Sequence, residues 1–324
     1  MNPSLPDPDS LSRLASFPLD PTLTLTPRVR LNLSIFPDAG SGVKPVDHWQ
    51  IKRALLDYLK AASRSLGSAS LQISGAGDPK KRRRGDAVAR GVLVVRDLGS
   101  VKEEDYETWK EKELRGRLDG IELVLEGTRF RVSVEVPAAD SFEDLRKEWL
   151  EYYAFKYKDR GRGAREEPDA IVIRGLPSRW FAETRVSSKP SMLVTHTIFS
   201  TLGSLRNIHV AEDDDFGQEV GDDTAGLVSG LHCKVVVQFE KQRDFHNALK
   251  ALCGRSLEKE GTQLIADYEV SWDKDNFFRY SRSHLQENGS GRTSSVHLGE
   301  IRRDVHKSRS RRSPEQARPK RFRE

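Results

Sequence analysis

In some segments of this chain every second residue is hydrophobic, and in others hydrophobic residues recur at helical spacing. The first pattern predicts strands and the second predicts helices. In the first half, strands are expected at residues 29–35, 70–73, 91–95, 121–125 and 130–136. Helices are expected after Asp47, a suitable N-cap, and over residues 106–114. This order is β-α-β-β-α-β with one extra strand before the last. It predicts an antiparallel sheet with two helices on one face.

The second half repeats this order with clearer boundaries. Strands are expected at residues 170–173, 205–210, 234–239 and 267–272, and helices at 191–202 and 242–253. Gly203 and Gly254 follow the two helices, as is typical of helix C-caps. We therefore expect an α+β chain with two ferredoxin-like βαββαβ domains.

A further helix is expected between the two halves, at residues 141–158. Its aromatic residues recur at helical spacing, so this stripe is expected to pack on a flanking domain. The predicted organisation is a disordered leader at 1–24, a domain at 25–137, a helix and linker at 138–167, a second domain at 168–275 and a disordered basic tail at 276–324.

Charge and composition narrow the class of protein. The whole chain carries +5, whereas residues 296–324 hold ten Lys or Arg against four Asp or Glu, a net of +6. Positive charge is therefore concentrated in the tail. Cys233 and Cys253 do not form a disulfide framework, which favours a reducing compartment. No apolar run reaches ~18 residues and the N-terminus is not a secretory signal, so no membrane partner is expected.

Catalytic chemistry is not predicted. The eight histidines are scattered, and none has metal-ligand spacing with Cys, Asp or Glu. Asp213, Asp214 and Asp215 are consecutive, whereas calcium loops alternate their ligands. We expect no enzyme activity, no metal, no cofactor and no small-molecule substrate.

Three motifs in the second half resemble an RNA recognition motif. The strand at 171–176 reads Ile-Val-Ile-Arg-Gly-Leu, Gly203 precedes the apolar positions of the next strand, and residues 237–239 read Val-Gln-Phe. The run at 168–182, with Gly-Leu-Pro-x-x-Trp-Phe-Ala, is similar to the segment that opens this motif in the A-kinase anchor protein 17A-like family of splicing factors. The resemblance covers about residues 25–275.

Membership of this family implies a nuclear location and a part in pre-mRNA splicing. It also raises anchoring of the cAMP-dependent kinase, which long members achieve with amphipathic helices in a C-terminal region. No amphipathic period follows the second unit of this chain, so anchoring is the less favoured interpretation.

The expected RNA contacts are unusual for such a motif. Bases normally stack on exposed aromatics of the central strands, but those positions hold Val172, Lys234 and Val236. We interpret the motif as degenerate. Candidate RNA-binding residues on its outward face and following loop are Val172, Arg174, Arg179, Trp180, Asn207, His209, Lys234, Val236 and Gln238. An alternative is that the sheet binds protein or is covered by a helix such as 141–158.

Two basic segments add further candidates. Lys80, Lys81, Arg82, Arg83 and Arg84 suit phosphate contact or nuclear import. In the tail, Ser308, Ser310 and Ser313 lie among arginines and are candidate phosphorylation sites. Each phosphate adds about −1.5 to −2 charges, so serine kinases could neutralise the tail. A simple import signal is the rival interpretation.

The sequence thus predicts a nuclear RNA-binding protein in pre-mRNA splicing or mRNA processing. The expected partners are single-stranded pre-mRNA, splicing proteins and serine kinases. The alternative is an adaptor whose domains bind proteins, as some RNA recognition motifs do through an Arg-x-Phe loop beside the second helix and an acidic first helix. Here residues 255–257 read Arg-Ser-Leu and the first helix is not acidic, which argues against the simplest adaptor.

Overall fold

The computed structural model describes residues 12–38, 47–62, 69–76, 83, 85–156, 167–213 and 230–279. All of these except Arg279 belong to one unit, which ends at Phe278. The strands of this unit form three antiparallel sheets, and the predicted α+β class is confirmed.

The first sheet, here the N-terminal sheet, follows the predicted element order. Its strands are β3 (Val29–Pro37), β4 (Ala69–Gly75), β5 (Ala89–Val95), β6 (Glu122–Leu125) and β7 (Thr128–Glu135), in the spatial order β4-β5-β3-β7-β6. One face is covered by α1 (His48–Ala62) and by the helical run η2 (Glu103–Asp105), α2 (Tyr106–Thr108), η3 (Trp109–Arg115) and α3 (Gly116–Leu118). Alternate apolar residues of the strands form the core beneath these helices, because a strand directs successive side chains to opposite faces.

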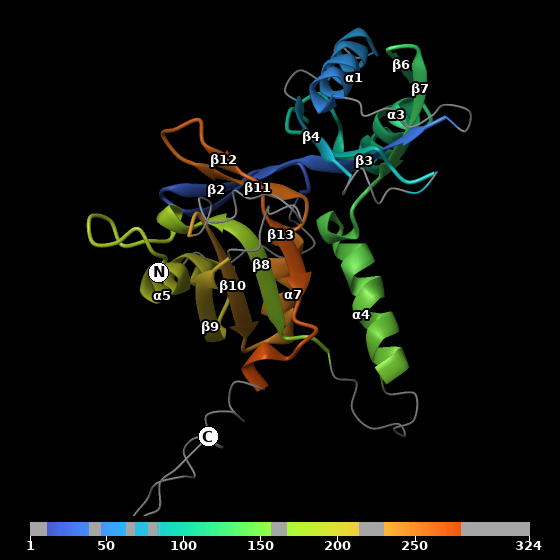
Figure 1. Ribbon diagram of the computed structural model, residues 1–324. Helices are drawn as coiled ribbons and strands as arrows, with labels where there is room; N and C mark the ends of the chain where they lie inside the picture. The colour runs from blue at the N-terminus through green and yellow to red at the C-terminus, as the bar shows by residue number, and fades with distance from the viewer. Residues whose placement is uncertain are drawn as a thin grey trace, which may run out of the picture. The chain divides into compact units, whose positions relative to one another are not determined.

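The second sheet, here the C-terminal sheet, also has the predicted order (Figure 1). It consists of β8 (Ala170–Pro177), β9 (Leu205–Glu212), β10 (His232–Phe239) and β13 (Glu269–Trp272), arranged β13-β8-β10-β9. The helical elements are η5 (Ser178–Trp180), α5 (Met192–Phe199), η6 (Ser200–Leu202) and α7 (Gln242–Leu252). Ile171, Ile173 and Val270 are buried in its core.

A third, small sheet was not predicted. It pairs β1 (Phe17–Asp20) and β2 (Leu23–Pro27) with β11 (Arg255–Lys259) and β12 (Ile265–Ala266). Leu25 lies opposite Leu257, and both are buried. The prediction of a disordered leader over 1–24 is therefore wrong for the residues of β1 and β2. The strands β1 and β2 thus share a sheet with strands of the C-terminal half before the chain enters the N-terminal sheet at β3.

The helix α4 (Phe142–Lys156), which follows η4 (Ala138–Asp140), packs on the C-terminal half. Trp149 stacks on His246 of α7 with ring centroids 5.8 Å apart, and Tyr152 meets Trp272 at 5.0 Å. The predicted packing of this aromatic stripe is confirmed. Because Trp272 faces the core, α4 lies on the helical side of the sheet and not over its open face.

Two further observations concern composition. Cys233 and Cys253 are buried and unpaired, and burial raises the pKa of the Cys233 thiol to about 12. Both therefore behave as small core residues. Among the described helices, none has the length and apolar character needed to cross a membrane.

Candidate nucleic-acid interface

The open face of the C-terminal sheet carries most of the residues predicted to bind RNA. Val172 and Arg174 of β8, Asn207 and His209 of β9, and Lys234, Val236 and Gln238 of β10 all lie on this face. Cross-strand pairing places Val236 between Val172 and His209. Val236 is only 1% exposed and Gln238 is 8% exposed, so the centre of the face is closed to solvent.

Polar groups on this face bind one another. Arg174 makes a two-point contact with Asp213, at 2.6 Å from Nη2 and 3.1 Å from Nε. Gln238 donates to Asp169 Oδ2 at 2.8 Å and accepts from Asn207. A bidentate arginine–carboxylate pair is among the stronger side-chain contacts, so Arg174 offers a phosphate a partly neutralised charge.

The segment after β13 lies against the open face of the C-terminal sheet. The ring of Phe277 lies 4.8 Å from the ring of His209. The Phe277 backbone N–H donates to Asp273 Oδ2 at 2.7 Å, which fixes this turn of chain. Burial, and secondarily the charge of Lys234, lowers the pKa of His209. The imidazole is therefore disposed to be neutral and offers RNA no extra positive charge.

The two aromatics after β8 have different roles. Phe181 is fully buried and stacks on Phe199 with ring centroids 6.0 Å apart. Trp180 is half-buried, and Arg179 beside it is exposed. Phe181 therefore anchors this loop in the core.

A groove of about 910 Å³ lies between the N-terminal and C-terminal sheets, and it is called the inter-sheet groove below. One wall is the open face of the N-terminal sheet, with Arg30, Val94 and Arg96. The other carries Arg174, Trp180 and His232. The groove thus joins two residues that the sequence had indicated, Arg174 and Trp180, to two cations that it had not.

The cations of the groove are held in place by carboxylates. Arg96 Nη2 lies 2.6 Å from Asp267 Oδ2, and Arg30 Nη1 lies 3.3 Å from Glu269 Oε1. Burial alone would raise the pKa of Asp267, but Arg28, the Ser256 hydroxyl and Arg96 together hold it below its ordinary value. Asp267 is therefore ionised at neutral pH and pairs with both Arg28 and Arg96.

The two sheets are joined by a buried arginine. Arg28 stands between β2 and β3, and its side chain is 1% exposed. Its Nη1 lies 2.9 Å from Asp267 Oδ1, and its Nη2 lies 3.3 Å from Asp140 Oδ1 and donates to Tyr268 O at 2.8 Å. Arg28 N–H also donates to Gly254 O at 2.9 Å. Asp267 and Tyr268 also line the groove, so Arg28 connects the start of β3 to that wall.

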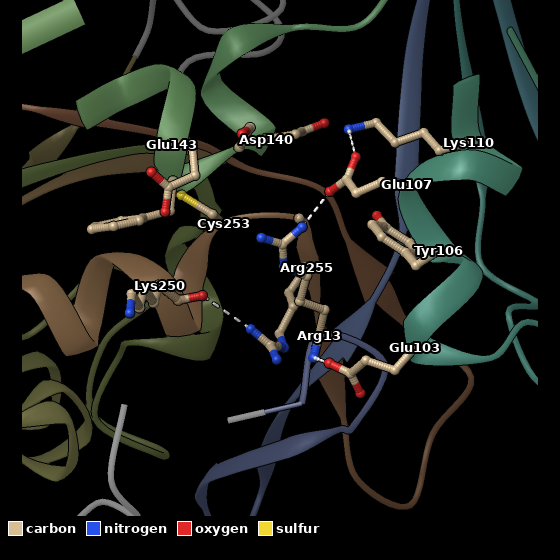
Figure 2. A pocket seen from close by; sticks show the side chains of 13 residues that line it. Arg13, Glu103, Tyr106, Glu107, Lys110, Asp140, Glu143, Lys250, Cys253 and Arg255 are labelled. Carbon is tan, nitrogen blue, oxygen red and sulfur yellow. Dashed lines mark hydrogen bonds and ion pairs between the residues drawn. The ribbon is translucent and has the colours of Figure 1, made fainter. Parts of the chain in front are cut away.

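A smaller cavity of about 320 Å³ lies beside this joint (Figure 2). Its four cations face four carboxylates, and the Arg13 side chain pairs with Glu107. Arg255 is buried and donates to the backbone oxygens of Ser12 and Ala251, both at 2.8 Å. Burial lowers the pKa of Arg255, and the charges cancel within the cavity. This cavity is a structural junction, and it removes Arg255 from the surface that an Arg-x-Phe adaptor loop would need.

Several predicted residues cannot be placed. Arg83 is exposed and its N–H donates to Asp86 Oδ2 at 2.7 Å, but Lys80, Lys81, Arg82 and Arg84 lie outside the described residues. The three tail serines, Ser308, Ser310 and Ser313, also lie outside them. Within the described ranges, no group of three His, Cys, Asp or Glu could hold a metal ion.

Arg30 and Arg96 were missed by the sequence reasoning, although weak signals exist. Arg30 occupies an outward position in the alternating strand at 29–35, and Arg96 directly follows the strand at 91–95. Alternation shows that a side chain faces outward. It does not show which distant loop faces it.

Comparison with known families decides the relationship of the chain. Residues 103–316 match the sequence model described as the AKAP-17A-like RNA-binding domain. The chain belongs to this family. The description of this family model names RNA binding and names no reaction. The match includes α4, the whole C-terminal sheet and the Arg174–Trp180 wall of the groove, but β3, β4 and β5 precede it.

A curated relative supports the same assignment. The chain is 24% identical over 261 residues to human A-kinase anchor protein 17A, and the match covers 78% of this chain but 34% of that protein. The AKAP-17A-like chain thus spans about a third of this relative. Solved structures with some similarity include a chlorite dismutase from Candidatus Nitrospira defluvii bound to imidazole, at 12% identity. The match covers 74% of this chain and 90% of that one, with a TM-score of 0.15.

Proposed function

We propose that this AKAP-17A-like protein binds single-stranded RNA in the inter-sheet groove and acts in pre-mRNA splicing in the nucleus. The observation that carries the proposal is the groove itself. It combines Arg30, Arg96 and Arg174 with the half-buried ring of Trp180. Cations that contact phosphates and an aromatic that stacks on a base are the two components of single-strand binding.

The wider architecture supports this role. Both large sheets place the first and third strands of a β-α-β-β-α-β unit in the centre. We interpret both as units of the RNA recognition motif type, the second with a degenerate face. Because Val236 is buried and Phe277 covers His209, the RNA contact shifts from the centre of that face to its edge at the groove.

The tail has a supporting role in this proposal. Arg-Ser dipeptides at residues 308–313 make serine kinases the proposed partners, with phosphorylation reducing nonspecific attraction to RNA. Splicing proteins are proposed as further partners on the basis of the family resemblance. Kinase anchoring is not proposed for this chain, since it matches only 34% of the relative whose name refers to anchoring.

A direct test replaces two groove cations without reversing their charge. The full chain and the Arg96→Gln/Arg174→Gln variant are titrated against a fluorescent single-stranded RNA at several salt concentrations. Each lost phosphate contact reduces the slope of log K against log salt by about 0.7, so the double variant is expected to lose about 1.4. Fluorescence anisotropy measures both the affinity and the slope.

The matched control is Arg53→Gln/Lys112→Gln, which removes two exposed cations from the helices on the other side of the N-terminal sheet. This control is expected to keep the slope of the wild type. Equal slopes for the control and the groove variant, with both proteins folded by circular dichroism, would place the RNA outside the groove.

A further inference from the structure

The open face of the N-terminal sheet continues the groove wall. Arg30 and Val94 line the groove and lie opposite each other across β3 and β5. Along the same two strands, the next outward pairs are Asn32 with Val92 and then Ser34 with Arg90. Since a strand rises ~3.4 Å per residue, Arg90 lies ~14 Å beyond Val94 on the same surface.

Three arginines mark the far part of this face. Arg90, Arg129 and Arg131 are exposed, and among the described residues none of them forms an ion pair. Arg90 lies directly across from Ser34 and Ser74, and Arg131 lies across from Phe36. This differs from the groove, where each arginine has a carboxylate partner.

The rest of the face suits a nucleic acid strand better than a protein. Many of its outward positions are short or polar: Asn32 and Ser34 on β3, Ser133 on β7, and Gln72 and Ser74 on the edge strand β4. The outward Val92 of β5 and Val124 of β6 are apolar but lie on different strands. Among the described strand residues, its carboxylates are Glu122 and Glu135, and Glu122 lies opposite Arg131. A protein-docking face is expected to carry a larger apolar patch.

Phe36 supplies the aromatic of this surface. It is half-buried, while its neighbour Ile35 is fully buried, so the Phe36 ring lies on the open face. Phe36 is six residues from Arg30, or ~20 Å along the strand. An exposed ring flanked by a free arginine is an arrangement that stacks a base and binds its phosphate.

We propose that an RNA strand leaving the inter-sheet groove continues along β3 and β5. Its phosphates contact Arg90 and Arg131, and one base stacks on Phe36. This inference rests on the proposed RNA binding, and it adds a second subsite. Phe36 and Arg90 lie outside the part of the chain that matches the family's RNA-binding domain, whereas Arg131 of β7 lies within it.

The test uses the length of the RNA as the variable. Unstructured oligouridines of about 6 and about 14 nucleotides, within the range of single-strand site sizes, are titrated against the full chain. The wild type is expected to bind the longer RNA at least ten-fold more tightly. In the Arg90→Glu/Arg131→Glu variant this gain is expected to disappear, while affinity for the short RNA stays within two-fold of the wild type.

Two further variants separate charge from fold. Arg53→Glu/Lys112→Glu reverses the same charge on the helical side and is expected to preserve the length-dependent gain. Phe36→Ala is expected to lower the affinity for the longer RNA roughly ten-fold, and Phe36→Tyr is expected to restore it, because stacking requires only a ring.

The outcomes distinguish the two proposals. If the wild type binds neither RNA, both proposals fail and the face is free for a protein partner. If the wild type binds both RNAs and the Arg90→Glu/Arg131→Glu variant keeps the gain, only the second subsite is overturned. Equal losses for the short and long RNA would also overturn it, because the arginines would then act on the groove and not beyond it.

Discussion

The two large sheets share an element order but differ in what their open faces offer. On the C-terminal sheet, Arg174 is paired with Asp213, and Phe277 lies over His209. On the N-terminal sheet, Arg90 and Arg131 are exposed, and the described residues include no ion-pair partner for them. The half with the recognisable motif thus has the more closed face. Motif resemblance reports the fold of a sheet, whereas ligand binding depends on which outward groups remain unsatisfied.

The largest effect on stability is expected when the joint between the two large sheets is removed. Arg28→Ala removes a buried guanidinium that pairs with the partly buried carboxylates Asp140 and Asp267. Breaking a buried ion pair in this way typically costs about 3–5 kcal/mol, so the free energy of unfolding is expected to fall by that amount. Urea denaturation followed by circular dichroism measures it.

The control for this prediction is Arg53→Ala on the exposed side of α1. An exposed substitution of this kind is expected to change stability by no more than about 0.5 kcal/mol. If Arg28→Ala behaves like this control, the joint does not hold the sheets together, and the inter-sheet groove has no fixed width.

A smaller effect is expected from uncovering the C-terminal sheet. Phe277→Ala removes the ring contact with His209. Such ring pairs contribute about 0.5–1.5 kcal/mol, so stability is expected to fall by about 1 kcal/mol. The affinity of the full chain for single-stranded RNA is expected to stay within two-fold of the wild type, as measured by anisotropy. A large gain in affinity would instead show that this face is an RNA site closed by Phe277.

The smallest effect is the pH dependence of stability that arises from His209, which contacts Phe277. The pKa of His209 is lowered by burial and then by Lys234, so the folded state favours the neutral ring. A histidine with a lowered folded pKa costs no stability above its unfolded pKa of about 6.5 and destabilises the fold as pH falls below that value. Stability is therefore expected to fall between pH 7.5 and 5.5, and less steeply in His209→Gln.

His246, which stacks on Trp149, also has a pKa lowered by burial. The His209→Gln variant is therefore expected to remove only part of the pH dependence, and His246→Gln a separate part. Unfolding free energies at the two pH values measure both. An unchanged slope in His209→Gln would show that the ring under Phe277 remains solvated.

Much of the fold could be predicted from local patterns. The alternating runs of the two large sheets and the aromatic stripe of α4 lie where the sequence placed them. The small sheet was missed, although Leu23 and Leu25 alternate with threonines in β2. Its partner strand β11 is about 230 residues away, and Arg255, Leu257 and Lys259 look like a loop after α7 when taken alone. Such a pairing has no local signal.

The residues of the candidate site also divide into those that local sequence patterns indicated and those that only the tertiary structure brought together. Arg174 and Trp180 were indicated by the motif, and both line the groove. The sequence by itself determined the order of strands and helices, the outward direction of each strand residue and the family resemblance, because these depend on local periodicity and short motifs. Only the tertiary structure decided that Arg30 and Arg96 face Arg174 and Trp180, that Asp213 and Phe277 close the C-terminal sheet, and that Arg28 joins the two halves. Those are contacts between distant segments, and their geometry is set by packing and by the pairing of buried charges.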